Sequence, residues 1–224
     1  MFLVDLKTEL DVLSFEFENQ GIAGLSIVTC HQLHGKILQF ILRAFGQEKL
    51  NILGLAASGV RWAGRTVLHT SGLQPASLLA PLARSGALVA SLHPVQSFAR
   101  KDAPASVFAG ITWGIEGDPA AVATCVRIVR ALRGRVLLLS EQDKPLYHAA
   151  CSLASNALVA LEATAAGALR TIGIEGREAE AMLLPLVQGT LQNVKNLGLE
   201  KALTGPVLRG DIDTVRGHLE ALRG

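Results

Sequence analysis

The sequence predicts an α/β domain with a mostly parallel sheet, followed by an all-α helical domain. Between residues 65 and 140, short apolar runs end in turn residues and alternate with amphipathic stretches. Their order is strand, helix, strand, strand, helix, strand, which favours a sheet covered by helices. From Asp143 onward the apolar residues keep a helical period. We therefore expect three parts: residues 1–53 without an assignment, residues 54–141 as the α/β part, and residues 142–224 as the all-α part.

The elements of the α/β part follow from the places where apolar runs meet helix and strand breakers. Gly86 and Gly134 end the two helical stretches, and Asp118 with Pro119 supplies an N-cap and a first-turn proline for the second. We expect strands at residues 66–68, 87–94, 108–118 and 135–140, and helices at residues 78–86 and 120–134.

The all-α part begins with the longest helix of the chain. That helix is expected from Asp143, a candidate N-cap, to Gly173, and two further helices follow at residues 178–197 and 211–224. Pro185 is expected to kink the first of these two. The charge-free apolar run 149–161 is too short to cross a bilayer, so we interpret it as a buried helix and expect no membrane partner.

Composition and spacing argue against several classes of function. Lys and Arg number 21 against 19 Asp and Glu, and the excess is scattered, so no basic surface predicts a nucleic acid partner. Cys30, Cys125 and Cys151 have no metal-type spacing and no signal peptide precedes them. We therefore expect small buried cysteines, no bound metal and a cytoplasmic location. No Walker loop, HExxH or GxSxG motif is present.

Lys144 and His148 are the candidate catalytic residues. A Lys or His at the start of a helix can protonate or polarise a carbonyl or imine, the step that general acid catalysis supplies. At about 100° of rotation per residue, Lys144, His148 and Ser155 share one helical stripe, and Ser152 and Asn156 flank it. A solvated lysine and an ordinary histidine are the simpler interpretation of the pattern alone.

Three polar stretches offer candidate binding residues. Residues 69–72 and 93–96 each follow a predicted strand, and the carboxyl ends of strands form the ligand crevice of open α/β sheets. A third stretch, residues 202–211, contains an arginine that could grip a carboxylate. Turn chemistry and helix capping are the alternative explanations. The candidates are His69, Thr70, Ser71, Gly72, His93, Gln96, Thr204, Arg209 and Asp211.

Four motifs in a fixed order carry a resemblance to a known family. They are GRTVLHTSG, LVASLHPVQSF, DKPLYHAACSLASN and ALTGPVLRGD. Together they resemble the Rossmann-like NAD(P)-dependent oxidoreductases with a C-terminal helical domain of unknown function. That family is distantly related to the 6-phosphogluconate, ketopantoate and pyrroline-5-carboxylate reductase group. The resemblance runs from about Leu55 to the end of the chain.

The resemblance implies a partial Rossmann-type domain that binds NAD(P), a small-molecule substrate in a cleft, and a homodimer formed by a helical domain similar to the C-terminal domain of 6-phosphogluconate dehydrogenase. It implies that Lys144, with His148 or Ser152, lies beside the substrate. Residues 69–72 and 93–96 would face the nicotinamide and the substrate.

The N-terminal segment departs from that family. Family members open with a strand, a glycine-rich turn and an acidic strand end that hold the dinucleotide, and residues 1–53 contain no recognisable counterpart. A divergent replacement would explain this, but the abrupt join near Leu55 favours an altered start or reading frame. We therefore expect a reductase-family protein with an incomplete cofactor site. A non-catalytic dimerisation or ligand-binding module and a truncated fragment without activity are the alternatives.

Overall fold

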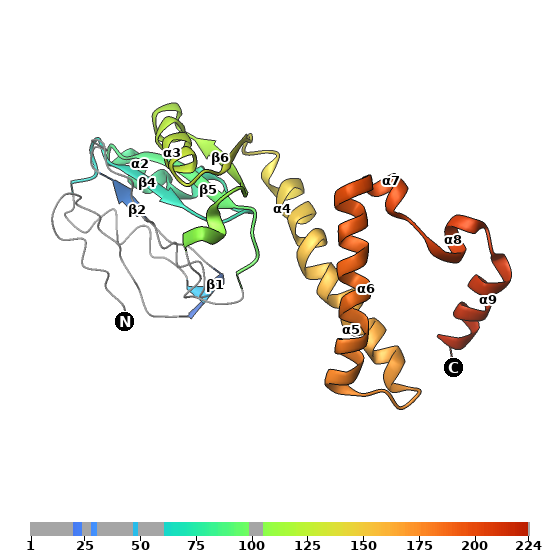
Figure 1. The fold of residues 1–224 in the computed structure, drawn as a ribbon. Helices are drawn as coiled ribbons and strands as arrows, with labels where there is room; N and C mark the ends of the chain where they lie inside the picture. The colour runs from blue at the N-terminus through green and yellow to red at the C-terminus, as the bar shows by residue number, and fades with distance from the viewer. Residues whose placement is uncertain (1–19, 24–27, 31–46, 49–60, 99–104, 224) are drawn as a thin grey trace. The chain divides into compact units, whose positions relative to one another are not determined.

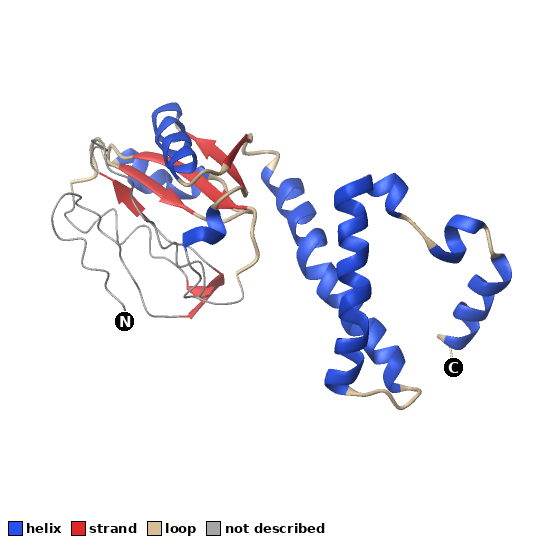
Figure 2. Ribbon diagram, viewed as in Figure 1, coloured by secondary structure: helices blue, strands red, loops and turns tan. Residues whose placement is uncertain are grey.

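A computed structural model describes residues 20–23, 28–30, 47–48, 61–98 and 105–223. The chain divides into two compact units, Met1–Ser152 and Leu153–Gly224. The first is built around a sheet and the second from helices alone, as Figure 1 and Figure 2 show, which confirms the predicted fold class. Most of residues 1–53, the part without an assignment, lies outside the described residues.

The first unit contains a five-stranded sheet with the order β2-β4-β5-β6-β7. β4 and β5 are parallel, as are β6 and β7, whereas β5 pairs with β6 and β2 with β4 in antiparallel fashion. A parallel arrangement of β5 and β6 would need a long crossover connection, usually an α-helix. The described part of their connection contains only the short helix η2 (Ala105–Phe108). The strands are β2 (Val28–Cys30), β4 (Thr66–His69), β5 (Leu88–Pro94), β6 (Thr112–Gly117) and β7 (Arg135–Leu138), with a separate antiparallel pair of β1 (Gln20–Ala23) and β3 (Gln47–Glu48).

Different helices cover the two faces of this sheet because side chains alternate along each strand. On one face Leu68 packs in a cluster with Trp113 and residues of α3. On the other face Val67 packs with Trp62 and residues of η1 and α2. These two are the only tryptophans of the sequence, and both are buried. The helices of this unit are η1 (Ala76–Leu79), α2 (Ala80–Arg84), η2 (Ala105–Phe108), α3 (Pro119–Ala131) and α4 (Lys144–Ser152).

The predicted side-chain cap of α3 is wrong in its detail. Asp118 occupies the N-cap position and Pro119 the first turn, but the Asp118 carboxylate makes no cap hydrogen bond. Its Oδ2 instead accepts from the Val89 N–H at 2.8 Å. The β5–β6 ladder ends with Ala90 and Gly117, so the Val89 amide lies beyond the ladder and needs another acceptor. Asp118 therefore ties the start of α3 to β5.

The long helix begins at Lys144, so Asp143 occupies the predicted N-cap position, and its side chain bonds to Ser140 in the preceding turn. The Ser140 N–H donates to Asp143 Oδ2 at 3.2 Å, and the Asp143 N–H donates to Ser140 Oγ at 3.3 Å. This reciprocal pair has the pattern of a capping box, here around the turn that leads from Ser140 into the helix. Hydrogen bonds from the Ser140 side chain and backbone lower the pKa of Asp143.

The second unit consists of helices, and the predicted helices at residues 178–197 and 211–224 are confirmed there. Asp211 caps the last helix as expected, because its Oδ1 accepts from the Thr214 N–H at 3.1 Å. The segment η3 is π-helical, so the rotation of about 100° per residue used to place Ser155 on the Lys144 stripe does not apply there. The elements are η3 (Leu153–Ala157), α5 (Leu158–Arg170), α6 (Gly176–Leu197), α7 (Leu199–Ala202), α8 (Gly205–Arg209) and α9 (Ile212–Ala221).

The expectation that residues 149–161 form a buried helix is wrong for the single chain. Leu153, Val159 and Leu161 are each at least 66% exposed. Within the described residues, one continuous helix, Lys144–Arg170, is long and apolar enough to cross a membrane by length and composition. Those two properties are weak grounds for a membrane helix, because helices of soluble proteins share them. The prediction failed because an apolar sequence shows that a helix face needs cover, not which part of the chain covers it.

Candidate functional site

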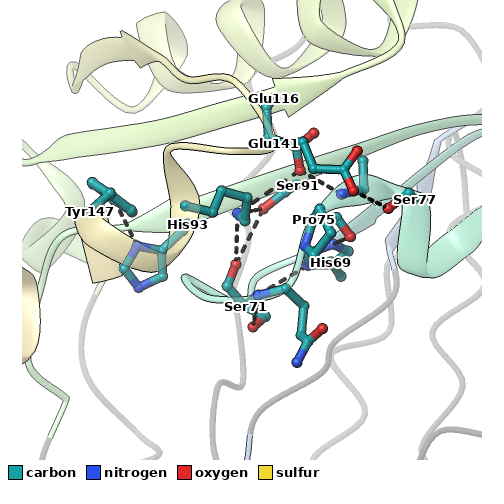
Figure 3. A network of polar contacts seen from close by, with 12 residues as sticks. His69, Ser71, Pro75, Ser77, Ser91, His93, Glu116, Glu141 and Tyr147 are labelled. Carbon is teal, nitrogen blue, oxygen red and sulfur yellow. Dashed lines mark hydrogen bonds and ion pairs between the residues drawn. The ribbon is translucent and has the colours of Figure 1, made fainter. Parts of the chain in front are cut away.

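One face of the sheet changes from apolar to polar toward the carboxyl ends of β4 and β5. Val67 and Val89 lie in the core, and two residues further along the same face carry His69 and Ser91. Ser91 is paired with His69 on one side and with Glu116 of β6 on the other. These three side chains form a polar row, and Figure 3 shows the network of contacts around it.

His69 shapes the loop that follows β4. Its Nδ1 lies 3.2 Å from the Ser71 N–H, which donates to it, and its Nε2 lies 3.0 Å from the Pro75 carbonyl oxygen. The ring therefore donates through Nε2 and accepts through Nδ1, which is the arrangement of a neutral imidazole. Burial is the main cause that lowers the pKa of His69 to about 4. Both ring nitrogens are engaged within the loop, in agreement with the turn-chemistry interpretation.

Lys144 reaches the polar row from the first turn of α4. Its side chain is completely buried, and its Nζ donates to Ser91 Oγ at 2.6 Å and to the Ser71 carbonyl oxygen at 3.2 Å. Glu116 Oε1 lies 4.0 Å from Nζ, so the ammonium has an opposite charge nearby. Burial is the main cause that lowers the pKa of Lys144, and Glu116 opposes it. Lys144 is therefore not the solvated side chain that the simpler interpretation predicted.

Glu116 joins this lysine to the helix η1. Its Oε1 accepts from the Ala76 N–H at the start of η1, where an unpaired backbone donor needs an acceptor. Burial raises the pKa of Glu116, whereas the Ala76 N–H and Lys144 lower it. A second link runs from Ser77 Oγ to Glu141 Oε1 at 2.8 Å. The loop after β4, the three strands and the start of α4 are thus held together by one network, the lysine network of Lys144, Ser91, Glu116 and the Ser71 carbonyl.

A second cluster, the histidine cluster, consists of His93, Tyr147, His148 and Gly72. His93 Nδ1 lies 2.7 Å from Tyr147 Oη, and the His93 and His148 ring centroids are 6.1 Å apart. Both imidazoles lie against Gly72, where an added Cβ would be 2.5 Å from His148 Cδ2 and 2.8 Å from His93 Nε2. Burial, His148 and Lys144, in that order, lower the pKa of His93 to about 4. His93 is therefore neutral near pH 7.

Thr70 carries the one buried hydroxyl of this loop that has no partner. Its side-chain oxygen is buried and forms no hydrogen bond with any part of the chain that the structure describes. An unpaired buried hydroxyl costs free energy, so such groups are commonly satisfied by something else. Its position after the carboxyl end of β4 is where a ligand of an open α/β sheet would meet it.

The structure brings several of the predicted site residues together within the first unit. Ser71, Gly72, His93, Lys144 and His148 belong to the two clusters, and His69 and Thr70 lie in the same loop as Ser71 and Gly72. Gln96 is exposed, and its Oε1 accepts from the neighbouring Ser97 N–H at 2.9 Å. Ser152 ends α4 and is half-buried. The remaining candidates, which lie in the second unit and whose binding roles stay predictions, are Ser155, Asn156, Thr204, Arg209 and Asp211.

Sequence reasoning missed Ser91, Glu116 and Tyr147. Each had a signal that could have found it. Ser91 and Glu116 are polar residues within largely apolar strands, where a buried polar side chain needs a partner. Tyr147 is the only tyrosine of the chain and directly precedes His148.

Comparisons with known proteins agree with this architecture. A Rossmann-like domain model matches residues 17–94. Protein TM1727 from Thermotoga maritima is 30% identical, with a TM-score of 0.58 over 67% of this chain and 57% of that protein. The "putative NADP oxidoreductase BF3122 from Bacteroides fragilis" is 24% identical, with a TM-score of 0.56 over 69% of this chain and 57% of that one, and shows the fold alone. The chain thus spans less than two thirds of either structure. No curated protein matches it.

The second family model covers the part of the chain that carries Glu116, Lys144 and Tyr147. It matches residues 111–224, just over half of the 224 residues, and its description is a domain of unknown function, DUF2520. The chain therefore belongs to the DUF2520 family. In this chain the DUF2520 domain follows a Rossmann-like domain.

Proposed function

We propose that this protein is an NAD(P)-dependent oxidoreductase that acts on a small molecule at the carboxyl ends of β4 and β5. The single observation that carries the proposal is the gathering of His93, His148 and the unpaired Thr70 hydroxyl around the loop after β4. Ligands of open α/β sheets bind at such strand ends. The Rossmann-like domain and the name of the Bacteroides relative support a nucleotide as the cofactor.

The residues of this loop fit one end of a dinucleotide. Thr70 offers a buried hydroxyl without a partner, and Gly72 brings backbone close to two imidazoles. The pyrophosphate of such a cofactor is usually held by a glycine-rich turn, and residues 1–53, most of which lie outside the described part of the chain, contain no recognisable one. When bound, NAD(P)H would supply a hydride to the substrate.

Lys144 and His148 keep their predicted importance, with different roles. His148 and His93 are half-buried imidazoles beside Gly72, and either can hydrogen-bond a substrate oxygen. Lys144 is buried and donates to Ser91 and Ser71, so its proposed role is to support the loop rather than to contact the substrate. It fixes the loop that contains Thr70 and helps to keep His93 neutral. In the proposed reaction, the substrate carbonyl would lie between an imidazole N–H and the hydride donor, where the N–H stabilises the charge that develops on the oxygen.

The second unit is proposed to form a homodimer. Its helices expose large apolar side chains, among them Leu161, Leu184 and Leu191, each at least 50% exposed. Surfaces of this kind mark contacts with other proteins or with membranes. The resemblance stated above implies a dimer through this domain, and a second copy would cover these side chains.

Cofactor titration of the full chain tests the proposal. Trp62 and Trp113 both lie in the first unit, so quenching of their emission by NADPH or NADH reports binding there. We expect one of the two cofactors to bind more weakly than micromolar, because no recognisable glycine-rich turn holds its pyrophosphate. The Thr70→Val variant should bind about tenfold more weakly, the equivalent of one lost hydrogen bond. It should fold normally because the hydroxyl has no partner to lose.

A matched control variant and two further outcomes make the cofactor titration decisive. Thr124→Val removes a hydroxyl that bonds the Ala120 carbonyl within α3, and it should leave cofactor affinity unchanged. A chain that binds neither cofactor at millimolar concentration would overturn the oxidoreductase proposal. If the wild type and the variants bind a cofactor equally well and none of them shows turnover, the ligand-binding module is favoured.

A further inference from the structure

Tyr147 and His93 form a contact that joins the two elements of the site. Tyr147 Oη lies 2.7 Å from His93 Nδ1, and the two rings meet edge to face at an interplanar angle of 90°. Tyr147 stands in the first turns of α4 and His93 near the end of β5. Figure 3 shows the phenol and the imidazole pointing toward one another. The other ring nitrogen of His93, Nε2, has no hydrogen bond with the described residues and is not sealed from solvent.

We propose that Tyr147 is a positioning residue that holds His93 in the tautomer with its proton on Nε2, so that Nε2–H can donate a hydrogen bond to a substrate oxygen. This proposal rests on the proposed function for the identity of the acceptor. The tautomer itself follows from the geometry of the chain. His93 donates a hydrogen bond and keeps its proton throughout.

The direction of the Tyr147–His93 hydrogen bond fixes the tautomer. The phenol O–H is a much stronger acid than the N–H of a neutral imidazole, and the unprotonated imidazole nitrogen is the stronger base, so the phenol is the favoured donor. The phenol proton then has two acceptors within reach, His93 Nδ1 and Cys151 Sγ. An imidazole nitrogen is a strong acceptor and a thiol sulfur a weak one, so the phenol donates to Nδ1. With Nδ1 accepting, the single proton of a neutral imidazole resides on Nε2.

Burial is the main effect that keeps both partners in the protonation states that this bond needs. His148 and Lys144 disfavour an imidazolium at His93, in addition to burial, which lowers its pKa most. Burial is also the main cause that raises the pKa of Tyr147, so the phenol stays protonated. A neutral imidazole N–H can polarise a carbonyl, as one does in triosephosphate isomerase.

Gly114 makes the contact possible. It pairs with His93 across the β5–β6 ladder, and an added Cβ would lie 2.6 Å from Tyr147 Oη. Its φ is not in the left-handed region, so its backbone tolerates other residues and only space requires glycine. A Gly114→Ala variant therefore displaces the phenol while every functional group of the site is still present.

The tautomer of His93 in the full chain tests the proposal directly. Long-range ¹⁵N–¹H correlation spectra of the six histidines, with His93 assigned through a His93→Gln variant, distinguish a protonated Nε2 from a protonated Nδ1. We expect a protonated Nε2 and an unprotonated Nδ1 in the wild type. Tyr147→Phe and Gly114→Ala should each give a mixture of the two tautomers. Cys151→Ala should leave the spectrum of His93 unchanged, since the phenol does not donate to sulfur.

A protonated Nδ1 in the wild type, or a pure Nε2–H tautomer in Tyr147→Phe, would overturn the proposal. Turnover provides the second readout. Tyr147→Phe should lower kcat roughly tenfold at an unchanged cofactor affinity, and it should have no further effect when His93 is already glutamine. Failure of the oxidoreductase proposal would appear as absent cofactor binding with the Nε2–H tautomer intact, so the two failures are distinguishable.

Discussion

Lys144 and Glu116 form a buried ion pair, with Nζ and Oε1 4.0 Å apart and both side chains at most 6% exposed. Removing one partner leaves the other charge buried without compensation. Lys144→Met should therefore destabilise the first unit by about 3–5 kcal/mol. Urea unfolding followed by tryptophan emission measures this, because both tryptophans lie in that unit.

Two further variants separate the charge effect from a general loss of packing. The double variant Lys144→Met with Glu116→Gln should recover much of the lost stability, since no charge then remains buried. Arg216→Met breaks an exposed ion pair with Asp213 in α9 and should change helix stability by at most about 1 kcal/mol, measured by circular dichroism. A Lys144→Met variant as stable as the wild type would contradict the assignment of a buried pair.

The stability of the first unit should fall with acid between about pH 6.5 and pH 4. His69 and His93 both have a pKa of about 4 in the folded chain and 6.5 as the ordinary value. In this window the unfolded chain binds protons that the folded chain excludes, so the free energy of unfolding rises with pH. A shift of this size corresponds to roughly 3 kcal/mol per histidine at most. Denaturation curves at several pH values measure the slope.

Variants of the two histidines test whether they cause this dependence of the free energy of unfolding on pH. His69→Gln and His93→Gln should each remove about half of it, because each variant leaves one depressed histidine in place. An unchanged slope in both variants would show that other groups cause the acid sensitivity.

Gly72→Ala should disturb the histidine cluster. The added methyl would lie 2.5 Å from His148 and 2.8 Å from His93, so the rings must move or the loop must shift. We expect a loss of about 1–3 kcal/mol of stability and altered imidazole resonances for both histidines. Gly189→Ala, in the middle of α6 with open space around its Cα, is the control and should raise helix stability by about 0.5–1 kcal/mol. Unaltered resonances in Gly72→Ala would contradict the described packing.

The exposed apolar side chains of the second unit should be covered in solution by a second copy. Light scattering should give the mass of a dimer for the wild type, and Leu161→Glu or Leu191→Glu should give monomers because each places a charge among apolar side chains. Gln192→Glu adds the same charge next to Leu191 on a polar position and should remain dimeric. A monomer that binds lipid vesicles instead would favour a membrane as the cover of the helix Lys144–Arg170.

Local patterns predicted the elements well because those patterns come from local physical chemistry. The alternation of apolar runs and turn residues placed β4, β5, β6 and β7, and Asp211 was correctly expected to cap α9. The errors arose where a side chain had two competing partners. Asp118 bonds the Val89 amide rather than capping α3, and Asp143, although it stands at the expected N-cap position, bonds Ser140 in the preceding turn. The partner of each carboxylate could not be predicted from the sequence, because it depends on which neighbouring backbone groups the strands and turns leave unpaired.

The site was predicted in part, for the same reason. Residues at strand ends and helix starts can be identified by position, which placed His69, His93, Lys144 and His148 in one region. Their roles depend on partners far away in the sequence, such as Glu116 at 40 residues from Ala76. Pattern analysis therefore found the lysine but could not show that it is buried and fully hydrogen-bonded.

The two family models divide the contacts of the site between them. Ser91 and His93 fall in the Rossmann-like match, residues 17–94, whereas their partners Lys144 and Tyr147 fall in the DUF2520 match, residues 111–224. A relative that acquired one half by recombination would inherit an ammonium without its serine, or an imidazole without its phenol. We therefore expect the two residues of each pair to have changed together during the divergence of the family. A chimera of halves from two relatives should form this site only when both residues of each pair come from the same relative.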